Sequence, residues 1–311
     1  MKNREIRGLV DVIKVTDPDE IRDLTSDLRV DREFSARTPL LNGLLIRKVL
    51  NALSFHGKRF PTMRPRGDAD RAHDQDALWE RLNERADNIR LGSADLDPLA
   101  QWVKGQKADA ELGVLVQQAV GKLFVDSYVA SPESWAAAMT LDAAPRPKSL
   151  LTAISWALTQ KVSRAKTLLA SKVNGDLAGV HGTGIALHNI VKGFREMQAL
   201  YGNISKRSAT SPESAASHCL FAPAAILRQA TSDGELAGCP FHKNAVFVLE
   251  LSEAHKQSDT NDLVFLENSW SRCPAERWVP ALFEGVWRRA SYTAQDALDS
   301  ISHSAKAEMA R

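Results

Sequence analysis

The spacing of apolar residues along the chain predicts a mainly helical protein. From residue 97 onward, apolar side chains recur every three or four positions, which is the period of a helix with one buried face. Most of these segments open with an acidic residue or a Ser-Pro pair, which are typical helix starts. We therefore expect helices over residues 97–104, 108–124, 132–141, 150–172 and 176–200, and a further one that opens at Ser211.

The first hundred residues alternate between short elements and polar connections. Residues 9–15 are a short apolar run that predicts a strand, and Asp17-Pro18 is a typical cap and first turn for the helix that follows. Residues 40–50 are apolar enough for a helix. Residues 59–76 are rich in Pro, Gly and charge, which predicts a loop before a helix over about residues 77–89.

A strand-rich patch is expected after Pro223. Residues 245–251 have the clearest strand pattern in the chain, residues 226–231 suit a second strand, and residues 233–238 suit a turn between them. The chain then returns to helical spacing, and a last segment over residues 293–305 leads to the C-terminus.

Composition excludes several classes of protein. The 311 residues are 44% hydrophobic and 25% charged, as in ordinary globular proteins. A net charge of +2 is too small to indicate a nucleic-acid or membrane surface. Three cysteines do not make a disulfide framework, and apolar runs stay shorter than a membrane span. We expect a cytoplasmic protein with no nucleic-acid partner and no membrane span.

Cys273 ends an irregular polar stretch, and a helical apolar pattern from Trp278 to Trp287 follows it. Such a cysteine lies ahead of a helix N-terminus, where the helix dipole, Arg272 and Arg277 favour a thiolate. The thiolate would suit a nucleophile, a redox group or a metal ligand. The simpler alternative is a small buried apolar residue.

Residues 178–184 place three glycines inside a predicted helix, although each costs about 1 kcal/mol relative to alanine. Close approach of a flat ligand or of another backbone would compensate for that cost. His181 and His188 fall on one face of the helix. The alternative is a close helix crossing with a core histidine.

Two other kinds of site fit the sequence poorly. A zinc site needs four ligands at suitable spacing, and the available residues are His218, Cys219, Cys239 and His242, whose spacing matches no known zinc motif. A serine hydrolase would need a Gly-x-Ser-x-Gly elbow, which the chain lacks.

Several segments, taken in order, resemble the cytochrome P-450 family: residues 15–35, 178–183, 228–238, 246–251 and 262–265, followed by Cys273. The resemblance implies a mainly α fold with a small β-rich part, which is a truncated cytochrome P-450-like fold. It implies a single haem domain over residues 1–311. The helical part would span about residues 17–222, the strand-rich part and cysteine loop 223–275, and the C-terminal helices 276–305.

The resemblance also assigns roles to residues. The cofactor would be haem b, with the Cys273 thiolate as the axial ligand of its iron. Arg228 would pair with a haem propionate, and Gly182 and Arg272 would contact the cofactor. Ala178, Gly179 and Thr183 would line the distal face. His181 and Thr183 would be the catalytic residues.

The chain departs from the family pattern at points that bear on function. The family's Glu-x-x-Arg pair maps to Ala215 and His218, its acid–alcohol pair maps to His181 and Gly182, and the glycines before the ligand cysteine are replaced. The resemblance implies a haem-thiolate oxidoreductase that acts on a hydrophobic small molecule. It would use oxygen and a ferredoxin-type redox partner, or peroxide with His181 as acid and base. The departures favour an alternative, a catalytically impaired homologue that serves as a partner or binding protein.

Overall fold

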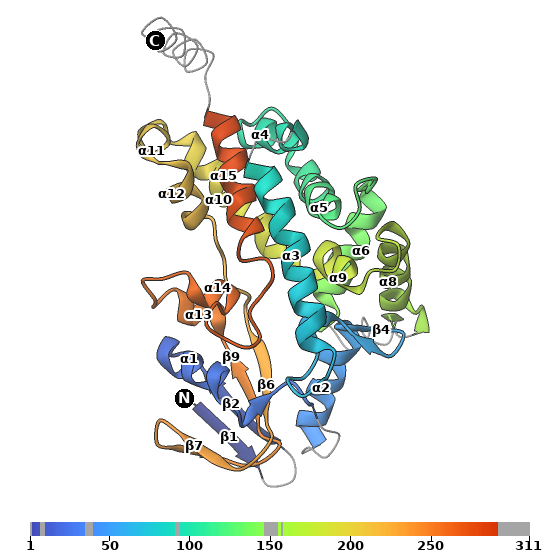
Figure 1. The fold of residues 1–311 in the computed structure, drawn as a ribbon, viewed down its shortest axis with the longest axis vertical. Helices are drawn as coiled ribbons and strands as arrows, with labels where there is room; N and C mark the ends of the chain where they lie inside the picture. Colours follow the sequence, from blue (N-terminus) through green and yellow to red (C-terminus); the bar gives the residue numbers. More distant parts are fainter. Residues whose placement is uncertain are drawn as a thin grey trace, which may run out of the picture.

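The computed structural model describes residues 2–6, 10–34, 40–90, 94–145, 155–156 and 158–291. Figure 1 shows a large helical part, with the long helix α3 (Arg71–Arg90) running through it, and a smaller part built on a sheet beside it. The predicted fold class, mainly α with a small β-rich part, is confirmed.

A five-stranded sheet pairs strands from the first 31 residues with strands from residues 226–249, in the order β1-β2-β9-β6-β3. Its strands are β1 (Lys2–Ile6), β2 (Val10–Val15), β3 (Val30–Asp31), β6 (Ile226–Ala230) and β9 (Val246–Leu249). The strand β2 pairs parallel with β9, and β6 pairs antiparallel with β9. The strands predicted from residues 9, 226 and 245 are therefore confirmed. Two hairpins complete the β structure, β4 (Ser54–Phe55) with β5 (Lys58–Arg59) and β7 (Gly234–Leu236) with β8 (Cys239–Phe241).

Three short helices lie beside the sheet in Figure 1: α1 (Pro18–Ser26), α13 (Leu251–His255) and α14 (Asp262–Phe265). The predicted start of α1 is confirmed, because the Asp17 carboxylate accepts the backbone N–H groups of Asp19 and Glu20 at 2.9 and 3.0 Å. Arg22 of α1 donates to both carboxylate oxygens of Asp262, at 2.7 and 2.9 Å. This ion pair ties α1 to α14.

The helical part contains the helices that the apolar spacing predicted, together with α11 and three 3-10 turns that it did not predict. Its elements are α2 (Leu40–Ala52), α3, α4 (Asp97–Val103), α5 (Leu112–Lys122), α6 (Pro132–Ala143), α8 (Lys161–Lys172), α9 (Leu177–His181), α10 (Leu187–Gly202), α11 (Ile204–Ala209), α12 (Pro212–His218) and α15 (Trp278–Ser291), with 3-10 turns η1 (Pro61–Met63), η2 (Ala94–Leu96) and η3 (Asp109–Glu111). A π-helical turn, η4 (Gly182–Ala186), joins α9 to α10. The predicted helix over 176–200 is thus confirmed as one continuous segment.

Two boundaries differ from the predictions. The helix α3 begins at Arg71 rather than near residue 77, because Arg64 pairs with Asp68 and Asp74 and folds the charged loop onto the first turn. The predicted helix over 150–172 is not continuous: residues 155–156 and 158 are helical, but Gln160 has a left-handed backbone (φ 50°) and α8 begins after it. Residues 150–154 and 157 of that helix and the predicted segment 293–305 lie outside the described residues.

Candidate functional site

Cys273 lies in the loop between α14 and α15, and its position is fixed by the backbone. Its N–H donates to the Phe265 carbonyl at 2.8 Å. A turn over residues 274–277 separates it from α15, so the cysteine precedes the helix by a few residues. Burial raises the pKa of the Cys273 thiol, and the charge of Arg32 and a hydrogen bond from the Ala275 backbone only partly oppose that rise. The predicted thiolate is therefore not favoured by these surroundings alone.

Four arginines surround the indole ring of Trp270, three residues before Cys273. We call this group the Trp270 arginine cluster: Arg32, Arg66, Arg71 and Arg228, whose guanidinium carbons lie 5.3, 4.8, 4.5 and 5.8 Å from the ring centroid. They come from four separate places, namely the end of β3, the loop before α3, the first residue of α3, and β6. The fold therefore gathers cations that are far apart in the sequence.

The cluster has more buried positive charge than the nearby carboxylate balances. The side chains of Arg32, Arg71 and Arg228 are 6%, 8% and 1% exposed. Burial lowers the pKa of Arg32 to about 9 and that of Arg228 well below its ordinary value, and the Asp31 carboxylate opposes both shifts. Asp31 accepts the backbone N–H groups of Arg32 and Arg66, at 2.6 and 2.9 Å.

Donor atoms in the cluster also lack acceptors. The Nε atoms of all four arginines are buried and have no hydrogen-bond partner in the part of the chain that the structure describes. Other donors are used: Arg71 donates to the Trp270 carbonyl at 2.6 Å and Arg228 to the Ser271 hydroxyl at 2.7 Å. Buried charge without a counter-ion is costly. This arrangement suits an anionic ligand with more than one negative charge.

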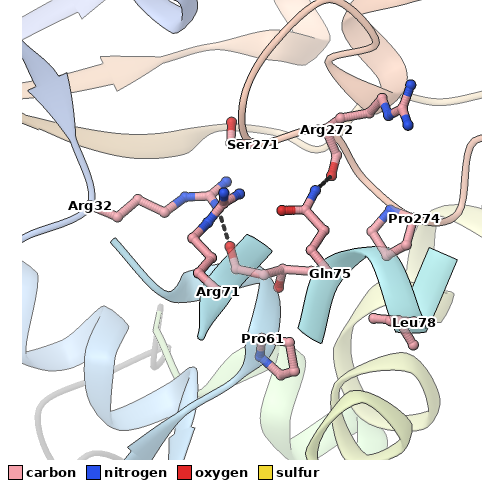
Figure 2. Close-up of a pocket in the computed structure, with 9 residues that line it drawn as sticks. Arg32, Pro61, Arg71, Gln75, Leu78, Ser271, Arg272 and Pro274 are labelled. Carbon is pink, nitrogen blue, oxygen red and sulfur yellow. Dashed lines mark hydrogen bonds between the residues drawn. The ribbon is translucent and has the colours of Figure 1, made fainter. Parts of the chain in front are cut away.

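A small pocket of about 10 Å³ lies beside the cluster, between α3 and the cysteine loop. Figure 2 shows Arg32 and Arg71 converging in it, while Gln75 donates to the Arg272 carbonyl at 3.1 Å. Its remaining lining residues are Pro61, Thr62, Leu78, Ser271 and Pro274. A cavity of this volume holds about one water molecule.

His181, the last residue of α9, faces η1. Its Nδ1 lies 3.4 Å from the Thr62 hydroxyl, and its ring lies 5.5 Å from the Phe60 ring. Desolvation and the charge of Arg32 lower the pKa of His181 to about 4, so the imidazole is neutral at neutral pH. A neutral imidazole has one basic nitrogen and can accept a proton.

The glycines of the central helix contact neighbouring side chains. A Cβ added to Gly179 would meet Val173 at 2.9 Å, one on Gly182 would meet Phe124 at 2.6 Å, and one on Gly184 would meet Leu169 and Leu141 at 2.8 and 2.9 Å. Close helix packing, one of the two explanations that the sequence allowed, accounts for all three positions.

The other two predicted distal residues, Thr183 and Ala178, have different surroundings. Thr183 is fully buried and donates to the Gly179 carbonyl at 2.7 Å, while its own carbonyl accepts from Gln117 at 2.9 Å. Its hydroxyl is therefore committed within its own helix. Ala178 belongs to the same cluster of buried side chains against which Cys273 packs.

Arg272 points away from the pocket. Figure 2 shows its side chain directed away from Arg32 and Arg71. Its guanidinium carbon lies 3.9 Å from the Trp79 ring centroid, and its Nε lies 3.4 Å from the Glu276 carboxylate. Only the Arg272 backbone faces the Trp270 arginine cluster.

The residues considered as zinc ligands do not form a metal site in the described part of the chain. His218 pairs with Glu196 at 3.2 Å, and burial raises the pKa of Cys219 to about 12. Among the described residues, no three His, Cys, Asp or Glu side chains gather as a metal site would require. Ala215, the other residue at the Glu-x-x-Arg positions, is fully buried.

Sequence reasoning missed most of the Trp270 arginine cluster. Only Arg228 was singled out, and Arg32, Arg66, Arg71 and Trp270 were not. The density of arginines in residues 59–76 was a signal, but a charged run usually marks a solvated loop. Burial of three of these guanidiniums follows only from the tertiary structure.

No protein-family profile and no curated protein matches the chain. Solved structures do match it. CYP175A1 from Thermus thermophillus has a TM-score of 0.59 at 14% identity over 91% of this chain and 81% of its own. CYP154C4 from Streptomyces sp. W2061 has a TM-score of 0.57 at 16% identity over 92% and 82%. The mycinamicin VIII C21 methyl hydroxylase MycCI from Micromonospora griseorubida has a TM-score of 0.58 at 12% identity over 91% and 83%.

These matches cover nearly the whole chain, although its 311 residues make it shorter than the matched proteins. None of the described helices is long and apolar enough to cross a membrane. The protein has the cytochrome P450 fold.

Proposed function

We propose that the protein binds haem b and acts as a haem-thiolate oxidoreductase of the cytochrome P-450 type. The observation that carries the proposal is the Trp270 arginine cluster beside Cys273: a buried thiol next to buried cations whose Nε donors are unpartnered. Haem needs a soft ligand for its iron and cations for its two propionates, and both are present within one loop of each other. These donors are of the kinds that haem requires.

Cys273 would hold the iron. Arg228, Arg71 and Arg66 would compensate the propionates, and Ser271 would keep Arg228 in place. When bound, haem supplies the oxidising chemistry. The charge of Arg32 favours ionisation of the Cys273 thiol against the opposing effect of burial, and a metal ion bound to its sulfur would favour ionisation further.

His181 is the residue that would transfer a proton during the reaction. His181, neutral and attached to Thr62, would accept and return a proton. The substrate would be a hydrophobic small molecule, oxidised with oxygen through a ferredoxin-type redox partner or with peroxide. MycCI, a hydroxylase in a complex with mycinamicin VIII, shows that the fold can carry such a reaction. The departure at Gly182, which has no hydroxyl, favours the peroxide route, because the alcohol of the proton-delivery pair is absent.

The reduced carbon-monoxide spectrum tests the proposal. The purified protein is loaded with haem, reduced and exposed to carbon monoxide, and the Soret band of a thiolate-ligated haem is expected. Cys273→Ala should lose this band and Cys239→Ala, in the strand β8, should keep it. A wild-type protein that takes up no haem, or a band that survives Cys273→Ala, would refute the assignment.

One observation favours the alternative of an impaired homologue that acts as a partner or binding protein. The pocket beside the cluster is only about 10 Å³, and Arg32 reaches into it. Under this alternative the cluster binds a small anion and the protein performs no oxidation. Titration with haem separates the two, because the alternative predicts no stoichiometric uptake.

A further inference from the structure

The small pocket beside the Trp270 arginine cluster is lined by two of the cluster's cations and by no carboxylate. Figure 2 shows Arg32 and Arg71 converging in it, and none of its other lining residues is an Asp or a Glu. Its volume of about 10 Å³ admits an occupant the size of one water molecule. The pocket therefore selects for a single small ion or molecule.

The positive charge at this pocket is not neutralised by an ion pair. Within the described residues, no carboxylate lies within 4.0 Å of a nitrogen of any cluster arginine. Asp31 is near enough to act on Arg32 and Arg228 through its charge, but its carboxylate accepts backbone N–H groups instead. Arginine stays protonated in proteins, so the charge cannot be relieved by loss of a proton.

Donor groups at the pocket are free to bind an acceptor. Arg32 and Arg71 are 6% and 8% exposed, and the Nε atoms of both are buried without a hydrogen-bond partner in the part of the chain that the structure describes. Each arginine is held by another of its nitrogens, Arg32 through the Thr62 carbonyl and Arg71 through the Trp270 carbonyl. The two guanidiniums are therefore fixed in place while donors on them remain unused.

We infer that this pocket binds one halide ion, with chloride as the ordinary occupant, between the guanidiniums of Arg32 and Arg71. A water molecule would fit but would bring no negative charge, whereas a phosphate or carboxylate group would bring charge but is too large. A monoatomic anion accepts N–H groups from any direction, and hydrogen bonds to a charged acceptor are the stronger kind. The inference does not rest on haem binding, because it concerns the chain before any cofactor is bound.

The bound halide would join the two parts of the fold. Arg32 follows the strand β3, Arg71 is the first residue of α3, and their charges repel each other. A shared anion converts that repulsion into two attractions. Because Arg71 also holds the Trp270 carbonyl, the anion would stabilise the cysteine loop as well as the contact between the sheet and α3.

Urea unfolding of the full chain without added haem tests the inference. Sodium chloride is exchanged for sodium gluconate at constant ionic strength, so that screening of surface charges stays the same. The midpoint of the wild type should rise with chloride, and at tenfold above the dissociation constant the unfolding equilibrium constant should be about tenfold lower. Fluoride should act like chloride, because it is smaller. A midpoint that does not respond to either halide would mean that the pocket holds only water and would overturn the inference.

Variants locate the effect. Arg32→Gln removes one of the two cations and should abolish the chloride dependence, and Arg32→Lys should restore part of it. Arg85→Gln, which removes a surface cation of α3 paired with Asp126, is the matched control and should respond to chloride like the wild type. Equal chloride dependence in Arg32→Gln and the wild type would place the halide elsewhere and overturn the assignment.

The chlorine NMR linewidth keeps the inference testable if the Arg32 variants do not fold. The native wild type should broaden the chloride line by an amount that saturates with chloride and that fluoride reduces, and the urea-unfolded chain should not. Equal broadening by the native and unfolded chains would contradict a folded halide site. Neither measurement uses the carbon-monoxide band, so failure of this inference leaves the proposed function untouched.

Discussion

Replacement of Gly184 by alanine separates the two explanations of the glycine-rich helix. A Cβ at this position would lie 2.8 Å from a Leu169 methyl and 2.9 Å from a Leu141 methyl. Both leucines are fully buried, so neither can retreat into solvent. Overpacking of this kind costs about 1–3 kcal/mol, and two opposed contacts place the cost toward the upper end. Alanine regains about 1 kcal/mol of helix propensity. The net expectation is a loss of about 1–2 kcal/mol.

Urea unfolding of the haem-free protein, followed by circular dichroism, measures this loss. The midpoint should fall by roughly 0.5–1 M at unchanged slope. Gly202→Ala is the matched control, because no atom lies within 4 Å of its Cβ position and the change should be neutral or stabilising. If Gly184→Ala were as stable as Gly202→Ala, helix packing would not be the reason for the glycine, and the flat-ligand explanation would be preferred.

Three further outcomes are expected. Folding lowers the pKa of His181 to about 4, so its contribution to stability is present above about pH 6.5 and is lost as the pH falls toward 4. Between pH 7 and pH 5, the urea midpoint of His181→Gln should therefore fall less than that of the wild type. Arg22 lowers the pKa of Asp262 to about 2, so the ion pair stabilises the fold above about pH 4 and this stabilisation is lost as the pH falls toward 2. Asp262→Asn should lack this part of the acid unfolding, and a variant whose acid unfolding matched that of the wild type would contradict the assignment. Trp270→Leu should lower the urea midpoint more than Trp270→Phe, because only the second keeps an aromatic face for the arginines.

Local signals predicted most of the fold. Asp17 and Ser211 cap helices as expected, because a cap is a contact between residues two or three apart. The strand that ends at Val15 and the strand that begins at Val246 were both predicted, but their parallel pairing was not. The pairing of Val12 with Val246 joins residues far apart in the sequence and follows only from the complete fold.

The site was less predictable than the fold, since it depends on contacts among distant segments. The sequence singled out Cys273 and His181, and their roles stay predictions, whereas the glycines near Thr183 pack against neighbouring side chains in the structure. Arg32 was not considered, because a single arginine after a short strand carries no periodic signal. Its burial depends on distant residues, among them Thr62, whose carbonyl accepts a hydrogen bond from it.

The absence of the family's Glu-x-x-Arg pair does not leave the cysteine loop unsupported, because α3 supports it directly. Arg71 donates to the Trp270 carbonyl at 2.6 Å, Gln75 donates to the Arg272 carbonyl at 3.1 Å, and Asp87 accepts from Arg277 at 2.9 Å. These bonds fix the loop from one rigid helix at both sides of Cys273. A loop held in this way does not need flexible glycines, and its two carbonyl acceptors orient α3 so that Arg71 enters the Trp270 arginine cluster. The same contacts therefore bring Arg71 into the group of cations that the proposed anionic cofactor would require.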